Sequence, residues 1–251
     1  MKGTVATGVI AKNPSASSWT GVLIARPEPG LSETMDAVRA LGWTPFAAPA
    51  LIIEPRFPPP QTKLSAALLT SSQAVAALSA SVAPDVPVFA VGDATARRVR
   101  AAGFHHVNSA GADAGALAAL VRARLAPSPA PILLLSGAGQ GLELASELRQ
   151  AGFKVLRRIA YSAHPVHAFP AAILRALQSN EIGIVTAFSA RSAAATGAAL
   201  KASGYDCRQL RGIAISDKAA HALRKSGIAD VRVARHPDAA SVIAALGHPP
   251  S

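Results

Sequence analysis

Short apolar runs alternate along the chain with longer segments in which apolar residues recur at helical spacing. The first run covers residues 22–25, and an amphipathic helix is predicted to follow it, with Ser32 as its N-cap and Gly42 as its stop. The pattern then repeats to the C-terminus. Further strands are predicted at residues 51–53, 86–91, 132–135, 154–161, 182–188, 213–215 and 231–234.

Alternating strands and helices are typical of parallel sheets that carry helices on both faces, so the predicted fold class is α/β. About ten strands in 251 residues fit two sheets of about five better than one wide sheet.

Internal repetition also favours two similar units. Three strand–turn–helix segments recur in the same order, and this predicts two copies of one α/β unit with a cleft between them. The segment from Val22 resembles the one from Ile132, that from Leu68 resembles the one from Thr186, and that from Val88 resembles the one from Gly212.

Composition narrows the class of partner. Half of the residues are hydrophobic, which predicts a large buried core, and the net charge is +11, with basic residues in small clusters such as Arg97, Arg98 and Arg100. An acidic small molecule, a nucleic acid or a membrane surface would each suit this charge. Aromatic residues make up only 4% of the chain, and the basic residues are not interleaved with them as in binders of single-stranded nucleic acid.

The remaining global features favour a cytoplasmic protein. The single cysteine, Cys207, excludes a disulfide within the chain and argues against a cysteine metal site. No apolar run approaches the roughly 20 residues that a membrane span needs. Residues 1–19 have no signal-peptide core and are interpreted as a mobile extension.

Turns rich in Ser, Thr and Gly follow four predicted strands, where parallel sheets bind ligands and free helix N–H groups can hold carboxylates. Two arginines in such turns are candidates for binding a carboxylate with both nitrogens. Thr95, and the equivalent serines Ser71 and Ser189, are each interpreted either as a helix cap or as a ligand contact. The candidate binding residues in these turns are Arg26, Ser71, Ser72, Thr95, Gly137, Ser189 and Arg191.

Several motifs, taken in order, resemble the uroporphyrinogen-III synthase family. They are IARPEPG from Ile24, APALIIEP from Ala48, LLTSSQAV from Leu68, AVGDATARRVRAAGF from Ala90, and ILLLSGAGQG from Ile132 with its helix and the strand that ends at Tyr161. The resemblance covers about residues 20 to 246, nearly the whole chain.

The resemblance implies two flavodoxin-like parallel-sheet domains joined by two extended linker strands, with the active site in the cleft between them. The first domain would be discontinuous and comprise residues 1–50 plus 164–251, with residues 53–160 inserted as the second domain. The chain would cross between the domains near residues 50–53 and 159–164.

The resemblance also implies a reaction. The substrate would be hydroxymethylbilane, a linear tetrapyrrole with eight carboxylates, which loses its terminal hydroxyl as water and closes with inversion of ring D. It implies no cofactor. A monomer without a metal is expected, and contact with the upstream bilane-forming enzyme is a further candidate partnership. Tyr161 matches a family tyrosine that assists the loss of hydroxide.

One turn departs from the family pattern. Where the family carries a second Gly-x-x-Thr, this chain has Ser216 and Ala219, so Ser216 and Lys218 are the substitute candidates for contacting substrate. This departure keeps an alternative open, a degenerate, non-catalytic two-lobed protein that binds a tetrapyrrole or another polycarboxylate. A dinucleotide site at SGAGQG is disfavoured, because Leu142 stands where the third glycine belongs.

Overall fold

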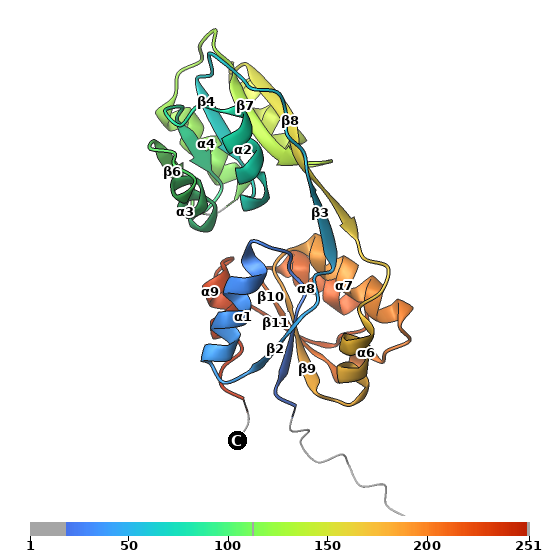
Figure 1. Cartoon of the computed structure of the whole chain (residues 1–251). Helices are drawn as coiled ribbons and strands as arrows, with labels where there is room; N and C mark the ends of the chain where they lie inside the picture. The colour runs from blue at the N-terminus through green and yellow to red at the C-terminus, as the bar shows by residue number, and fades with distance from the viewer. Residues whose placement is uncertain (1–18, 112, 250–251) are drawn as a thin grey trace, which may run out of the picture.

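The computed structural model describes residues 19–111 and 113–249 and is a mixed α/β fold with two parallel-dominated sheets. Each sheet and its helices form one lobe, and the lobes lie one above the other (Figure 1). Most of the predicted 1–19 extension lies outside the described residues. Its last residue, Trp19, is described and stacks on Trp43 with ring centroids 6.1 Å apart.

The first lobe is built on a five-stranded parallel sheet with the order β11-β10-β9-β1-β2. Its strands are β1 (Gly21–Ile24), β2 (Thr44–Ala47), β9 (Ile182–Ala187), β10 (Arg211–Ala214) and β11 (Asp230–Val233). Its helices are α1 (Gly30–Ala40), α6 (Ala171–Gln178), α7 (Ala190–Ala202), the 3-10 helix η2 (Cys207–Gln209), α8 (Asp217–Lys225) and α9 (Ala239–Ala244).

The second lobe has a six-stranded sheet with the order β3-β8-β7-β4-β5-β6, in which only the β3–β8 pair is antiparallel. Its strands are β3 (Leu51–Pro55), β4 (Ala66–Leu69), β5 (Val88–Ala90), β6 (Val107–Ser109), β7 (Ile132–Gly137) and β8 (Val155–Pro165). Its helices are the 3-10 helix η1 (Ser72–Ala74), α2 (Val75–Ser81), α3 (Asp93–Ala101), α4 (Ala114–Arg124) and α5 (Leu142–Gln150).

The central strands, such as β1, β4, β5 and β7, are continuous and buried apolar runs because helices cover both faces of each sheet. In β1, Leu23 joins the core beneath α6, α7 and α8, whereas its neighbours Val22 and Ile24 join the core beneath α1 and α9. The second lobe is layered in the same way, with α2 and α3 over one face of β7 and α4 and α5 over the other. None of the described helices combines the length and the apolar character that a membrane crossing requires.

The strand order agrees with the internal repeats. In the first sheet the neighbours run β1-β9-β10, and in the second sheet their counterparts run β7-β4-β5. Each sheet therefore takes its first segment from one copy of the repeat and the next two segments from the other copy.

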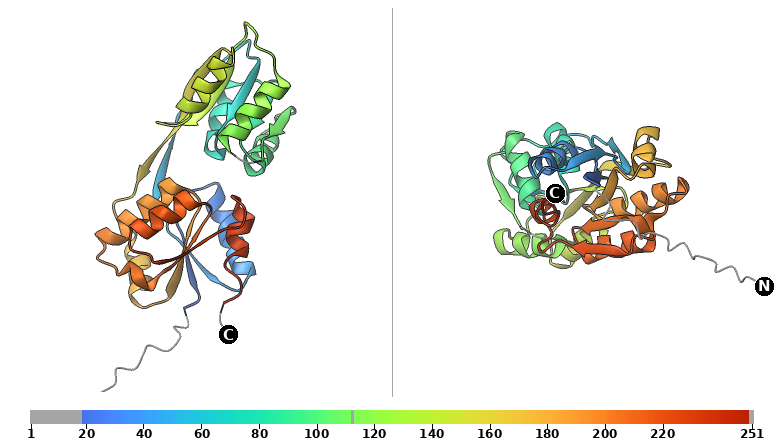
Figure 2. Two further views of the ribbon diagram at one scale, coloured as in Figure 1. Left: turned by 180° about the vertical axis from the view of Figure 1, so that it is seen from behind. Right: turned by 90° about the horizontal axis from the view of Figure 1, so that it is seen from below.

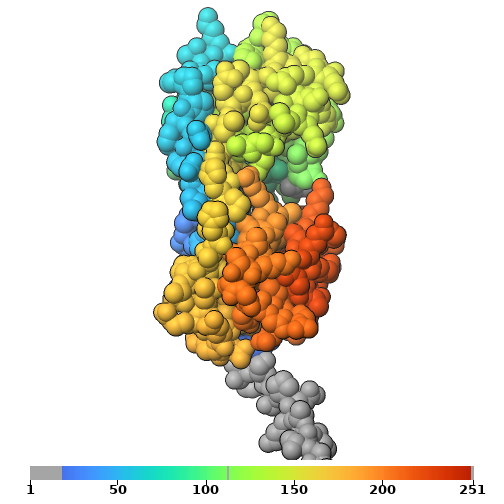
Figure 3. Space-filling view, turned by 90° about the vertical axis from the view of Figure 1, so that its right-hand side faces the viewer, coloured from blue at the N-terminus to red at the C-terminus, as the bar shows by residue number. Residues whose placement is uncertain are grey.

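Strands β3 and β8 connect the lobes along one side. They pair antiparallel from Leu51 opposite Pro165 to Pro55 opposite Tyr161. Figure 3 shows β8 as a continuous yellow to gold band from one lobe to the other, and Figure 2 shows both strands from behind. Both carry the residues at which the sequence predicts the chain to cross.

The start of α1 differs from the prediction. The helix begins at Gly30 after Pro29, and Ser32 lies inside its first turn, so Ser32 is not the N-cap. The Ser32 hydroxyl donates to the Glu28 carboxylate instead. Proline lacks a backbone N–H and suits the start of a helix, because an N–H there would have no partner within the helix.

Candidate functional site

A cavity of about 320 Å³ lies between the lobes, within the size range of small-molecule sites. The carboxyl ends of β1 and β9 reach it from the first lobe, and the ends of β4 and β7 reach it from the second. Its lining includes Arg26, Pro29, Phe188, Ser189 and Arg191 from the first lobe and Thr70, Ser71, Ser72, Gln73, Gln140 and Tyr161 from the second.

Arg26 follows β1 and brings a positive charge to the cavity. Its guanidinium lies 4.3 Å from the centre of the Phe188 ring, and its Nη1 donates to Thr34 Oγ1 at 3.2 Å. Burial is the main cause that lowers the pKa of Arg26, followed by the charge of Arg98, but an arginine remains protonated at neutral pH. No ion pair joins Arg26 to a carboxylate among the described residues, although the charges of Glu33 and Glu28 act on it from a greater distance.

Arg191 is the second cation of the cavity. It lies in the first turn of α7, whose N-cap is Ser189, and the Ser189 hydroxyl accepts from the N–H of Ser192 at 3.0 Å. Arg191 Nη2 donates to the carbonyl of Ala163 in β8, so this side chain also joins α7 to a connecting strand. Like Arg26, it has no carboxylate partner within the described part of the chain.

Ser71 has the same local role in the second lobe as Ser189 has in the first. It is the N-cap of η1, and its Oγ accepts from the N–H of Gln73 at 3.2 Å. Ser72 lies beside it and lines the cavity. The two serines predicted to be equivalent thus face one cavity from opposite lobes.

Tyr161 lies in β8 at the centre of the site. Strands β7 and β8 change register between Ser136 and Gly137, so that Gly137 pairs with Tyr161, and such irregularities re-aim side chains. The Tyr161 hydroxyl donates to Gln140 Oε1 at 3.2 Å. Burial raises the pKa of Tyr161, while a hydrogen bond with Ser71 and the charge of Arg191 act in the opposite direction. The phenol is therefore protonated at neutral pH and able to donate.

Gly137 contributes by its lack of a side chain. It does not line the cavity, and a Cβ atom at this position would lie 2.8 Å from Cζ of Tyr161. The residue is the surface against which the tyrosine ring rests.

Two further residues of the cavity bear on its chemistry, Gln140 and Thr70. The side-chain Oε1 of Gln140 accepts a hydrogen bond from the Tyr161 hydroxyl, and its backbone carbonyl accepts from Arg157 Nη1 at 2.9 Å and from Ser136 Oγ at 3.0 Å. Thr70 Oγ1 is buried and has no hydrogen-bond partner. Among the described residues, every other side-chain N or O atom that is buried to this degree has a partner. A buried hydroxyl without a partner is costly, so each case calls for an explanation such as a catalytic role or a bound water or ion.

Besides Gly137, three candidates do not line this cavity, namely Thr95, Ser216 and Lys218. Thr95 is the third residue of α3 and buried, and because the N-cap of that helix is Gly92, the capping interpretation of Thr95 is wrong. Ser216 is the N-cap of α8, where its hydroxyl accepts from the N–H of Ala219 at 3.4 Å. Lys218 is exposed in the first turn of the same helix.

Fold and site together define a two-lobed α/β protein with a cationic, hydroxyl-lined cavity between its lobes. The family model described as uroporphyrinogen-III synthase HemD matches residues 32–244, and the chain belongs to this family, the cyclising lyases of tetrapyrrole biosynthesis. A search of curated protein sequences found no match.

Solved structures agree in fold. The chain is similar to the uroporphyrinogen-III synthetase of Helicobacter pylori, with 16% identity, a TM-score of 0.62, and coverage of 90% of this chain and 97% of that one. It is also similar to a mutant uroporphyrinogen III synthase of the extremely thermophilic bacterium Thermus thermophilus, with 17% identity, a TM-score of 0.51 and the same two coverages. At these identities the likeness concerns the fold.

Proposed function

We propose that the cavity between the lobes binds hydroxymethylbilane and closes it to the ring-inverted product with loss of water. The observation that carries the proposal is that two arginines without carboxylate partners in the described chain, Arg26 and Arg191, line the same cavity as Tyr161. A substrate with eight carboxylates needs cations to hold it, and its chemistry needs one proton donor.

Binding is assigned to charge and to hydroxyl groups. Arg26 and Arg191 would each take a substrate carboxylate, because a guanidinium matches a carboxylate through two parallel hydrogen bonds. Ser71, Ser72 and Ser189 would donate to further carboxylates or orient the pyrroles. The net charge of +11 would also attract the polyanion before it enters the cleft.

Tyr161 would act on the leaving group. As the terminal C–O bond breaks, the electron pair leaves with oxygen and the Tyr161 proton completes a water molecule. The phenolate that remains would be stabilised by Ser71 and Arg191, the two groups that favour the charged form of Tyr161. After the spiro rearrangement and ring closure, the proton released by the macrocycle returns to the phenolate. The protein's larger contribution would be to hold the flexible bilane bent.

We further propose that both lobes are flavodoxin-like. Numbered along the chain, the first sheet has the strand order 2-1-3-4-5, which is the flavodoxin order. The five parallel strands of the second sheet have the same order when β7 and β8 are counted before β4, β5 and β6, as the internal repeats require, and β3 adds an antiparallel strand at the β8 edge. The proposed domain limits are residues 1–50 plus 164–251 for the first and 53–160 for the second.

The proposed partners are few. One chain supplies both walls of the cavity, so we propose that the protein works as a monomer. We also propose that it works in the cytoplasm without nucleic acid or metal. Contact with the bilane-forming enzyme would serve to deliver substrate. Substrate contacts at Thr95, Ser216 and Lys218 stay predictions, because these residues lie outside the cavity that supports the proposal.

A non-catalytic binding protein is the second candidate. It is favoured by Ser216 and Ala219, which stand where the family pattern has Gly and Thr. The deciding experiment incubates the protein with freshly made hydroxymethylbilane and separates the type I and type III isomers after oxidation. The proposal expects the type III isomer, whereas a binding protein would leave only the type I isomer of spontaneous closure.

A further inference from the structure

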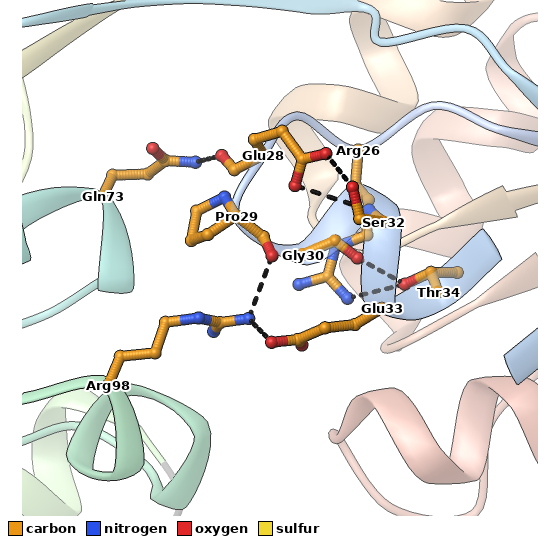
Figure 4. A network of polar contacts seen from close by, with 9 residues as sticks. All are labelled: Arg26, Glu28, Pro29, Gly30, Ser32, Glu33, Thr34, Gln73 and Arg98. Atoms are coloured by element: carbon orange, nitrogen blue, oxygen red, sulfur yellow. Dashed lines mark hydrogen bonds and ion pairs between the residues drawn. The ribbon is translucent and has the colours of Figure 1, made fainter. Parts of the chain in front are cut away.

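The two lobes touch across the cavity at a second place, away from the connecting strands. Arg98 of α3, in the second lobe, lies with Nη2 2.6 Å from Glu33 Oε1 of α1, in the first lobe. The same nitrogen donates to the carbonyl of Pro29 at 3.2 Å, and Gln73 of η1 donates to the carbonyl of Glu28. Figure 4 shows these contacts converging on the turn between β1 and α1. We call Arg98, Glu33 and Gln73, with the two carbonyls, the clasp.

The clasp lies on the side of the cavity opposite the connecting strands. Figures 1 and 2 show β3 and β8 on one side of the gap and the start of α1 near α3 on the other. Pro29 and Gln73 belong both to the clasp and to the cavity lining. The cavity is therefore bounded on one side by the connecting strands β3 and β8, which are part of the chain, and on the other side by non-covalent contacts of the clasp.

The charges and the burial make Arg98 the central residue of the clasp. Its side chain is only 18% exposed, whereas that of Glu33 is 65% exposed. A guanidinium that is largely removed from water needs its partners, since an unpaired charge in such a place is costly. The positive charges of Arg98 and Arg26 repel each other, and the negative charge of Glu33 offsets this repulsion.

The clasp also fixes the turn that carries Arg26. That turn is held from the first lobe by the bond between Arg26 and Thr34, and from the second lobe by Arg98 and Gln73. If the second-lobe contacts were lost, Arg26 would keep its local partner but would no longer face Ser71 and Tyr161 at a fixed separation.

We propose that Arg98 is a positioning residue, which closes the cleft by joining the lobes and thereby sets Arg26 against Tyr161. Its catalytic consequence rests on the proposed function, whereas the closure of the lobes does not. An ordinary exposed ion pair would contribute little to either. The proposal also means that substrate enters when the clasp opens, because the connecting strands stay in place.

The test uses charge reversal and its rescue. Arg98→Glu places two acids together and breaks the clasp, and the double variant Arg98→Glu/Glu33→Arg restores an ion pair with the order reversed. Arg97→Glu is the matched control, because Arg97 is the exposed neighbour on the same helix and the change in net charge is the same. Melting temperatures identify any variant that fails to fold, and Glu33→Gln offers a milder change at an exposed side chain.

Two readouts separate closure from catalysis. Spin labels at Ala40→Cys in α1 and Ala101→Cys in α3, both exposed positions, report the distance between the lobes in a Cys207→Ala background. We expect Arg98→Glu to lengthen and broaden this distance distribution, Arg97→Glu to leave it unchanged, and the double variant to narrow it again. For catalysis, we expect Arg98→Glu to raise KM roughly tenfold, in keeping with the loss of a charge-assisted contact, and the double variant to recover most of it.

Specific outcomes decide the question. An unchanged distance distribution in a folded Arg98→Glu protein would overturn the proposal, as would an equal loss of activity in Arg97→Glu, which would indicate electrostatic steering alone. If wild-type protein made no type III isomer, the proposed function would fail, yet the distance measurement would still decide whether the clasp closes the lobes.

Discussion

The change Gly137→Ala tests how closely the site depends on the position of one tyrosine ring. A Cβ atom at residue 137 would lie 2.8 Å from Cζ and 2.9 Å from Oη of Tyr161, whereas ordinary contact begins at 3.4 Å. The ring must therefore move by about 0.6 Å in a close-packed interior. This shift is enough to lengthen the 3.2 Å bond to Gln140 beyond hydrogen-bonding distance.

The expected cost falls on turnover. Misplacing a reacting group by about 1 Å can cost about 10²-fold in rate, so we expect kcat to fall roughly 10- to 100-fold. The assay is the initial rate of type III isomer formation per folded molecule. A double-mutant cycle with Tyr161→Phe gives the cause, because Gly137→Ala should slow the Phe enzyme hardly at all if it acts through the Tyr161 hydroxyl.

The matched control is Gly92→Ala, at the N-cap of α3. A Cβ atom there meets nothing within 4 Å, so this variant should keep its rate. The reasoning would be refuted if Gly137→Ala slowed the Phe enzyme and the wild type by the same factor.

Three further predictions follow from the cavity. Tyr161→Phe should lower kcat by about 10²-fold or more, as the loss of a general acid does, and a lower melting temperature at an unchanged rate per folded molecule would contradict the assignment. Because the pKa of Tyr161 is raised, the native state holds the phenol proton more tightly than the unfolded chain does. The free energy of unfolding should therefore fall as pH rises above about 10, and it should fall less steeply in Tyr161→Phe. Denaturant titrations in which both proteins lose the same free energy of unfolding with pH would contradict this. Thr70→Val should leave the melting temperature equal or higher, because the hydroxyl has no partner in the described chain, but should raise KM severalfold; an unchanged KM would mean that Thr70 meets no ligand.

The interior of each sheet and one of its two edge strands, β11 in the first sheet and β3 in the second, could be predicted from the sequence, whereas the opposite edge strand could not. The buried strands are continuous apolar runs, and the predictions for β1, β7 and β9 are confirmed to within two residues at either end. Strands β2 and β6 were not predicted. Each is the last strand of its sheet and is only partly buried, so neither needs an apolar run or an alternating pattern.

The site was partly predictable for a similar reason. Arg26, Ser71, Ser189 and Arg191 follow strands, and the rule that ligands bind at strand ends is local enough to apply to a sequence. Gln140 was missed because its role comes from a register change between β7 and β8 and from packing against Tyr161. The clasp was missed as well, since Arg98 and Glu33 meet only when the two lobes have been assembled.

The central claim is that the two cavity arginines hold the bilane in the bent form that closes with inversion. The most direct test is the fraction of type III isomer formed from hydroxymethylbilane by the double variant Arg26→Gln/Arg191→Gln. The control, Arg97→Gln/Arg124→Gln, loses the same two charges from exposed positions. We predict that wild type and control form mainly the type III isomer and that the cavity variant forms mainly type I. A folded cavity variant that matched the wild type in rate and isomer fraction would contradict the account.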